Sequence, residues 1–148
     1  MEPKRITSFR DLDVYRGTYK ACIEIMTQLL PKLPESEKYD LKDQLSRSTK
    51  AIPRLIAEGY AKRHQKAGFQ KYLDDAMAEC NETIVGLEMC RDIYKQQIKS
   101  FHIDEYIEIY DKAGRQLFKL SEAWSRFKAE RRNPKTQRAS SPSPNDKQ

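Results

Sequence analysis

The sequence predicts an all-α fold, an antiparallel up-down-up-down four-helix bundle with a kinked second helix. Its 148 residues suit one domain with a core large enough to fold without disulfides or metal. Charged residues make up 34%, with only 5 Gly and 7 Pro, which disfavours collagen-like chains, β-sandwiches and membrane proteins. Four segments repeat apolar residues at steps of three and four, and the short connections between them make successive helices antiparallel neighbours.

The first helix is expected from Ser8 to about Leu30. Ser8 and Asp11 have the spacing of a capping box, and Pro31 and Pro34 end the helix because proline lacks an N–H and restricts the residue before it. The apolar stripe consists of Phe9, Leu12, Tyr19, Ile23, Met26 and Leu30.

The second helix carries a proline in its interior. Pro53 lies within a stripe that keeps its phase, which favours one kinked helix over two short ones. Gly59 continues the stripe, and because it has no Cβ we expect a close helix approach there. The stripe consists of Leu41, Leu45, Ser48, Ile52, Leu55, Ile56 and Gly59.

The third and fourth helices follow the clearest periods. The third is expected over residues 66–98, with Phe69, Tyr72, Leu73, Ala76, Cys80, Thr83, Ile84, Leu87, Cys90 and Tyr94 on one face. The fourth is expected to begin between His102 and Asp104, with one side formed by Ile103, Tyr106, Ile107, Tyr110, Gly114, Leu117, Ser121 and Trp124. Residues 1–128 therefore form the bundle, and residues 129–148 are expected to be a disordered basic tail containing Ser and Pro.

A second apolar face lies on the third helix. Val85, Met89 and Ile93 lie opposite its core stripe, and Val14 and Ile25 lie off the main stripe of the first helix. Scattered apolar residues are normal on protein surfaces. Contiguity along two turns favours instead a contact with another subunit, to which Val14 and Ile25 can also belong.

The charges are unevenly distributed. The net charge is +6, and the stretch from Lys42 to Lys71 alone carries eight basic residues against two acidic ones. The stretch from Asp74 to Asp111 carries ten acidic residues against three basic ones. A row of cations can neutralise phosphates, whereas the alternatives are a solvated face or a surface that meets acidic residues of a neighbouring subunit. The candidate nucleic-acid-binding residues are Arg47, Lys50, Arg54, Lys62, Arg63 and Lys66.

No motif for catalysis or cofactor binding is present. The sequence lacks GxxxxGK[ST], GxGxxG, HExxH and GxSxG, and neither of its two histidines follows a glutamate at the di-iron spacing. Asp75, Glu79 and Glu82 share a helix face, which can hold a hard cation but more commonly is solvated or forms salt bridges. The three cysteines have no metal or disulfide spacing. We therefore expect no catalytic residues, metal or cofactor, and a protein that is not an enzyme.

The expected location is the cytoplasm. No apolar run approaches the ~18 residues that a membrane span requires. The first six residues lead into polar residues and not into the apolar core of a signal peptide.

Several motifs resemble the bacterial four helix bundle protein family, also called the ribosomal RNA intervening-sequence protein family. They are Phe9-Arg10-Asp11-Leu12-Asp13-Val14-Tyr15, Tyr39-Asp40-Leu41 and the run from Ile52 to Tyr60, which reads Ile-Pro-Arg-Leu-Ile-Ala-Glu-Gly-Tyr. The resemblance covers about residues 8–122. It implies a kinked second helix and a homopentamer. A related branch of the family is the accessory variability determinant of diversity-generating retroelements. Resemblance to that branch implies binding of nucleic acid and of a reverse transcriptase. The chain departs from the family pattern at Arg54-Leu55 and at Ile84, where the family often has Ser-Asn and Glu.

Two functions follow as hypotheses. The first is a non-enzymatic, homo-oligomeric protein, a pentamer by resemblance, that binds RNA or DNA as a ribonucleoprotein accessory and assists a retroelement reverse transcriptase. The second is a structural adaptor that binds a protein partner without nucleic acid.

Overall fold

The structure, a computed structural model, describes residues 5–65 and 67–132, with side chains through residue 126. Within these ranges the chain is all-helical, without β-strands, which confirms the predicted all-α class. Lys66 and residues 133–148, most of the expected tail, lie outside the described residues. The four long helices are α1 (Asp13–Glu24), α2 (Leu41–Ala61), α3 (Gly68–Ile93) and α4 (Ile103–Arg132).

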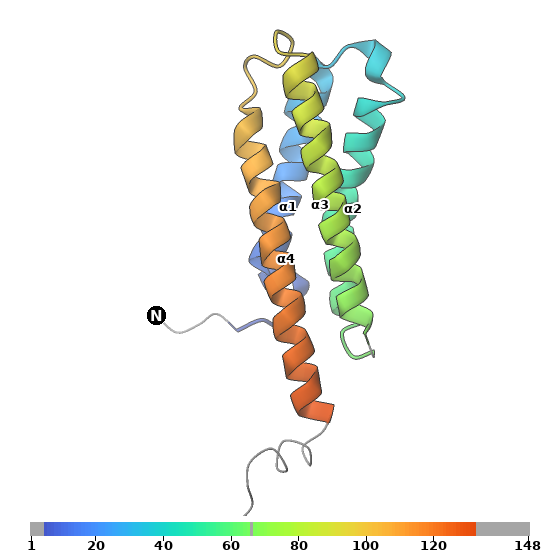
Figure 1. Ribbon diagram of the computed structural model, residues 1–148, viewed down its shortest axis with the longest axis vertical. Coiled ribbons are helices and arrows are strands. Elements are labelled where there is room, and N and C mark those ends of the chain that lie inside the picture. The colour runs from blue at the N-terminus through green and yellow to red at the C-terminus, as the bar shows by residue number, and fades with distance from the viewer. Residues whose placement is uncertain (1–4, 66, 133–148) are drawn as a thin grey trace, which may run out of the picture.

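The helices pack side by side around one core. In Figure 1 the α1–α2 and α3–α4 connections lie at one end and the α2–α3 connection at the other, so successive helices run in opposite directions. The most extensive contacts join α3 to α2 and to α4, while α1 packs on α2 and α4. This arrangement places α1 diagonally opposite α3. The largest fully buried side chains include Tyr110, Phe69, Leu45 and Leu117.

The first helix begins later than the sequence predicted. The capping box forms, with Ser8 Oγ accepting from the Arg10 N–H and Asp11 Oδ2 accepting from the Ser8 N–H. It caps only the short 3-10 turn η1 (Phe9–Asp11), because extended backbone at Leu12 separates that turn from α1. Helical backbone then continues past α1 through a π-helical turn, η2 (Ile25–Leu29), and a 3-10 turn, η3 (Leu30–Lys32).

The predicted core stripe of the first helix is confirmed at its two ends, where Leu12 and Leu30 are buried, but within α1 the core face is rotated from the predicted one. Tyr19 and Ile23, which the sequence places in the core, are 51% and 47% exposed. Val14 and Ile25, which the sequence allows at a subunit contact, are 5% and 0% exposed and belong to the core. The inward face of α1 also consists of Thr18, Ala21 and Cys22. Because these residues are small or polar, counting large apolar residues selected the outer face.

The second helix is continuous from Leu41 to Ala61, with Pro53 buried inside it. Two short helices separated by a loop are therefore absent, whereas the bend at Pro53 stays a prediction. The close approach at Gly59 is confirmed. A Cβ at Gly59 would lie 2.7 Å from Tyr72 Cβ and 3.0 Å from Phe69 Cδ1, both on α3.

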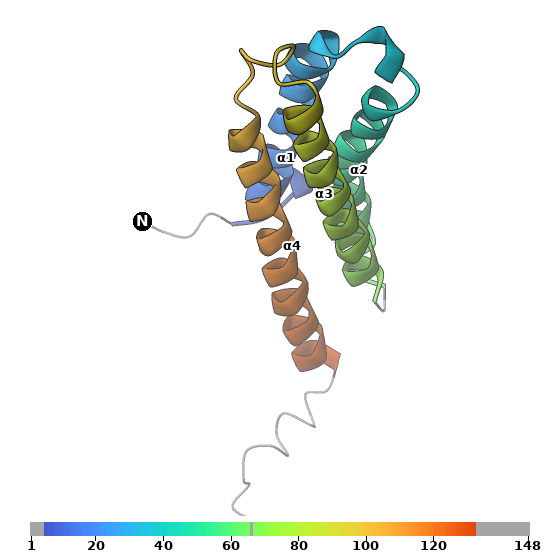
Figure 2. The same ribbon diagram turned by 45° about the horizontal axis from the view of Figure 1, so that its top comes forward.

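The limits of α3 and α4 differ from the predicted ones. Ala67 has a left-handed backbone with φ 59°, which no α-helix accommodates, so α3 begins at Gly68 and not at residue 66. Backbone at Tyr94 leaves the helical region, and α3 ends at Ile93 and not at residue 98. The last helix reaches Arg132, four residues past the expected bundle boundary, and both views show it extending beyond the other three helices (Figures 1 and 2).

Candidate nucleic-acid interface

The basic ridge, defined as Arg47, Lys50 and Arg54, lies on the side of α2 that faces away from the core. Arg47 and Arg54 are exposed and Lys50 is half-buried, while the core side of α2 holds Leu45 and Ile52. Arg47 Nε forms an ion pair with Asp43 Oδ2 at 3.1 Å. Among the described residues, Lys50 and Arg54 have no ion-pair partner.

Arg54 adjoins an acidic surface. It lines a shallow groove of about 380 Å³ between α2 and α3, together with Glu58, Asp75 and Glu79. Burial raises the pKa of the Glu79 carboxyl, and the neighbouring carboxylates Glu82 and Asp75 raise it further. The ridge is therefore cationic at Arg47 and Lys50 and mixed at Arg54. Among the side chains that the structure describes, through residue 126, no three His, Cys, Asp or Glu side chains are grouped so as to hold a metal ion, including Asp75, Glu79 and Glu82.

Lys62 and Arg63 lie apart from the ridge, at the turn after α2, and each contacts a tyrosine. Lys62 Nζ donates to Tyr72 Oη at 2.7 Å and lies 5.0 Å from the centroid of that ring. This hydrogen bond raises the pKa of Lys62. Arg63 Nη1 donates to the Tyr60 carbonyl at 2.8 Å, and its Cζ lies 4.1 Å from the Tyr60 ring centroid.

The two tyrosines were missed as candidate functional residues. Tyr60 precedes Arg63 by three residues, a spacing at which helical side chains become neighbours, and this signal could have identified the pair. The Lys62–Tyr72 contact joins the turn after α2 to α3 across ten residues, so no spacing within one helix reveals it. Lys66, the sixth candidate, lies outside the described residues.

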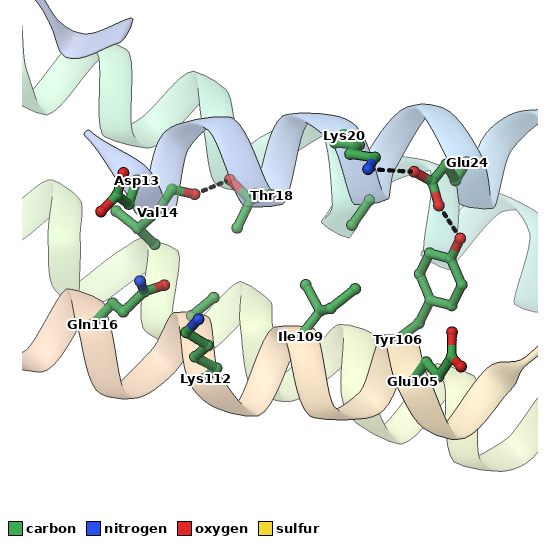
Figure 3. A pocket seen from close by; sticks show the side chains of 13 residues that line it. Asp13, Val14, Thr18, Lys20, Glu24, Glu105, Tyr106, Ile109, Lys112 and Gln116 are labelled. Carbon is green, nitrogen blue, oxygen red and sulfur yellow. Dashed lines mark hydrogen bonds and ion pairs between the residues drawn. The ribbon is translucent and has the colours of Figure 1, made fainter. Parts of the chain in front are cut away.

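A groove between α1 and α4 is a further cavity that the sequence did not indicate (Figure 3). Its volume is about 440 Å³, and small residues such as Gly17, Ala21 and Ala113 line it. At one end Tyr106 Oη donates to Glu24, which also pairs with Lys20 Nζ at 3.9 Å. Burial, and then the hydrogen bond to Glu24, raise the pKa of Tyr106 to about 12. Tyr106 is thus a neutral donor at physiological pH, and this contact ties α1 to α4.

Five of the exposed large apolar side chains lie on α1 and α3, while Phe118 on α4 and Tyr39 before α2 lie apart from them. On α3, Val85, Met89 and Ile93 are 50%, 46% and 61% exposed, as the sequence predicted for a second apolar face. On α1 the exposed apolar residues are Tyr19 and Ile23. Because α1 and α3 are diagonal in the bundle, the molecule has an apolar strip on each of two opposite sides.

The remaining candidate reactive groups are the three cysteines, which are buried, and His64, which is exposed. Cys22, Cys80 and Cys90 are buried free thiols, and burial raises the pKa of Cys80 and of Cys90 to about 12. His64 is exposed in the turn after α2. Over the part of the chain that the structure describes, every helix falls short of the length and apolar character needed to cross a membrane.

Comparison with known proteins identifies the family. No curated protein matches the chain. The sequence model of the 23S rRNA-intervening sequence protein family matches residues 10–119, which span the bundle from η1 through most of α4. The chain therefore belongs to the 23S rRNA-intervening sequence protein family.

Proposed function

We propose that this chain is a non-enzymatic, homo-oligomeric nucleic-acid-binding protein that acts as a ribonucleoprotein accessory. The observation that carries the proposal is the basic ridge of Arg47, Lys50 and Arg54 on the outer side of α2. Cationic side chains in a row contact phosphates and release condensed counterions. The family name, which refers to a sequence intervening in 23S rRNA, supports a nucleic acid as the partner.

The test is the salt dependence of binding. The triple variant Arg47→Ala, Lys50→Ala, Arg54→Ala should bind duplex RNA or DNA more weakly, and the slope of log affinity against log salt should flatten by about two to three. Contacts to phosphate carry no sequence information, so wild-type binding should tolerate changes of sequence.

A matched control removes the same charge elsewhere. Lys38, Lys95 and Lys99 are exposed in the α1–α2 and α3–α4 connections, outside the ridge, and their triple alanine variant should retain the wild-type slope. An unaltered slope in the ridge variant, with its oligomer mass preserved, would remove the ridge from the proposal.

The assembly that we propose is a ring, with five subunits on the basis of the resemblance. The two apolar strips support it, because the α1 strip of one subunit can cover the α3 strip of the next, and such head-to-tail contacts form a ring when the rotation between neighbouring subunits closes. Sedimentation equilibrium should give a multiple of 17.4 kDa. Met89→Glu should lower this mass, whereas Gln96→Glu, in the α3–α4 connection, should not. A monomer at micromolar concentration would contradict the ring.

A structural adaptor is the second candidate. Arg47 is already paired with Asp43, and the exposed strips can equally cover a different protein. The adaptor hypothesis predicts that nucleic-acid binding is absent, or that it comes from the tail and disappears on truncation after Lys128.

The main proposal also includes a protein partner, a retroelement reverse transcriptase, which the family resemblance alone supports. Copurification of the two proteins tests this partner.

A further inference from the structure

The corner between α2 and α3 pairs two cations with two aromatic rings. Arg63 lies over the Tyr60 ring, and Lys62 contacts Tyr72, as described above. Tyr60, Arg63 and Tyr72 are each half-buried, so part of every side chain stays in solvent. His64, which follows Arg63 in the chain, and Lys71, which precedes Tyr72, are also exposed. The corner is therefore both cationic and aromatic at the protein surface.

The backbone and the core hold this corner in one arrangement. The Arg63 N–H donates to the Tyr60 carbonyl at 3.3 Å, and the Gln65 N–H donates to the Lys62 carbonyl at 3.0 Å. A Cβ at Gly68 would lie 2.6 Å from the Lys62 carbonyl oxygen, so the turn closes tightly on itself.

Aromatic packing supports the tyrosine side of the corner. Tyr60 makes an edge contact with Phe69, which makes another with Trp124 on α4, at centroid separations of 6.2 and 5.3 Å. The ring under Arg63 is thus anchored in the bundle and the guanidinium is preorganised.

This geometry suits an unpaired nucleobase. A guanidinium is planar and stacks on aromatic faces, and unstacked bases of single strands stack on aromatic rings and on arginine planes. Lys62 uses one donor for Tyr72, which leaves ammonium donors for a phosphate beside the base. We propose that the α2–α3 corner is a stacking site for an unpaired base of single-stranded nucleic acid, with Arg63 on Tyr60 as the platform. This inference rests on the proposed function. It gives the corner a preference for strands with unpaired bases, which contacts between the ridge and phosphates do not provide.

The experiment compares strands of equal length with and without bases, and single strands with a duplex. Fluorescence anisotropy with the full chain measures affinity for a single-stranded uridine 12-mer, a deoxyuridine 12-mer, an abasic phosphodiester of equal length and a duplex. The base-bearing single strands should bind about fivefold or more tightly than the abasic strand. The two base-bearing arms distinguish ribose from deoxyribose.

Two matched variants isolate the platform. Arg63→Lys keeps the charge but loses the plane, so the ratio between base-bearing and abasic strands should fall toward one while the salt slope is retained. Tyr60→Phe keeps the ring and should retain the wild-type ratio. Thermal melting checks that both variants are folded.

The outcomes separate this inference from the function on which it rests. Equal wild-type affinity for base-bearing and abasic strands, or a ratio unchanged in Arg63→Lys, overturns the stacking site and leaves the ridge proposal standing. Absence of binding to every probe at low salt overturns the proposed function itself.

Discussion

Polar side chains occupy several fully buried positions of this bundle, and most of them have a partner. Thr83 Oγ1 donates to Ser48 Oγ at 2.8 Å, joining α3 to α2. Thr49 Oγ1 donates to the Leu45 carbonyl at 2.6 Å within its own helix. The hydroxyl of Tyr110 is the contrast, because among the described residues it has no hydrogen-bond partner although the side chain is 0% exposed.

Removing the Tyr110 hydroxyl should not harm the fold. Tyr110→Phe deletes a buried hydroxyl that has lost its hydrogen bonds to water without gaining a protein partner. The free energy of unfolding should therefore stay constant or rise by up to about 1 kcal/mol. Thr83→Val is the comparison, because it leaves the Ser48 hydroxyl without its donor and should cost about 1–3 kcal/mol. Urea denaturation measures both. A loss above about 1 kcal/mol in Tyr110→Phe would indicate a buried water bonded to the hydroxyl.

A methyl group at two helix-interior glycines should have opposite effects. Gly59→Ala places a Cβ against Tyr72 Cβ, where the backbone must shift, and should lower stability by about 1–3 kcal/mol. Gly17→Ala meets nothing within 4 Å on α1 and should raise stability by about 0.5–1 kcal/mol through helix propensity. Thermal melts distinguish them, and equal effects would refute the packing role of Gly59.

Burial should protect the thiols from alkylation. Because burial raises the pKa of Cys80 and of Cys90 to about 12, both stay protonated at pH 8, and only the thiolate reacts. Iodoacetamide at pH 8 should therefore modify these residues slowly in the native protein and rapidly in urea, as mass spectrometry can measure. The native rate should still climb between pH 8 and pH 10, since the thiolate fraction keeps growing below the pKa. Rapid native modification at pH 8 would contradict their burial.

At the scale of the helices, the sequence predicted some faces and not others. The core face of α3 was predictable because large apolar residues such as Phe69, Leu73 and Leu87 recur at helical spacing and are buried. On α1 the same reasoning failed, since Thr18 and Ala21 lie inward while Tyr19 lies outward. The ridge on α2 was predictable from spacing along one helix. The tyrosine partners at the α2–α3 corner depend partly on packing between helices, which spacing does not encode.

The rotation of α1 can be tested with two isoleucines. Ile25→Ala empties a site that is 0% exposed and should cost about 2–5 kcal/mol. Ile23→Ala, two residues away, changes a side chain that is 47% exposed and should alter stability of the separated subunit by less than about 0.5 kcal/mol. Chemical denaturation at low protein concentration makes the comparison. The opposite ranking would restore the face first predicted from the sequence.

Over the whole molecule, basic and acidic residues are separated. The basic stretch from Lys42 to Lys71 lies on α2, the corner and the start of α3, whereas most acidic residues from Asp74 to Asp111 lie on α3 and the start of α4. The apolar strips lie on α1 and α3. In the proposed ring, rotation about one axis relates the subunits, so every α2–α3 corner lies at the same height along that axis. The ring is then expected to present its cations as a belt at one level.

The groove between α1 and α4 has a consequence for local unfolding. Because α1 shares less packing with the bundle than α3 does, opening of α1 alone should require less free energy than global unfolding, and its amides should exchange with deuterium before those of α3. If the exposed strip of α1 is covered by a neighbouring subunit, this exchange should slow as protein concentration rises. Exchange in α1 that is as slow as in α3 at high dilution would contradict the weaker attachment. If exchange in α1 slows as protein concentration rises, α1 gains part of its native order from the neighbouring subunit. Completion of the fold is in that case coupled to assembly.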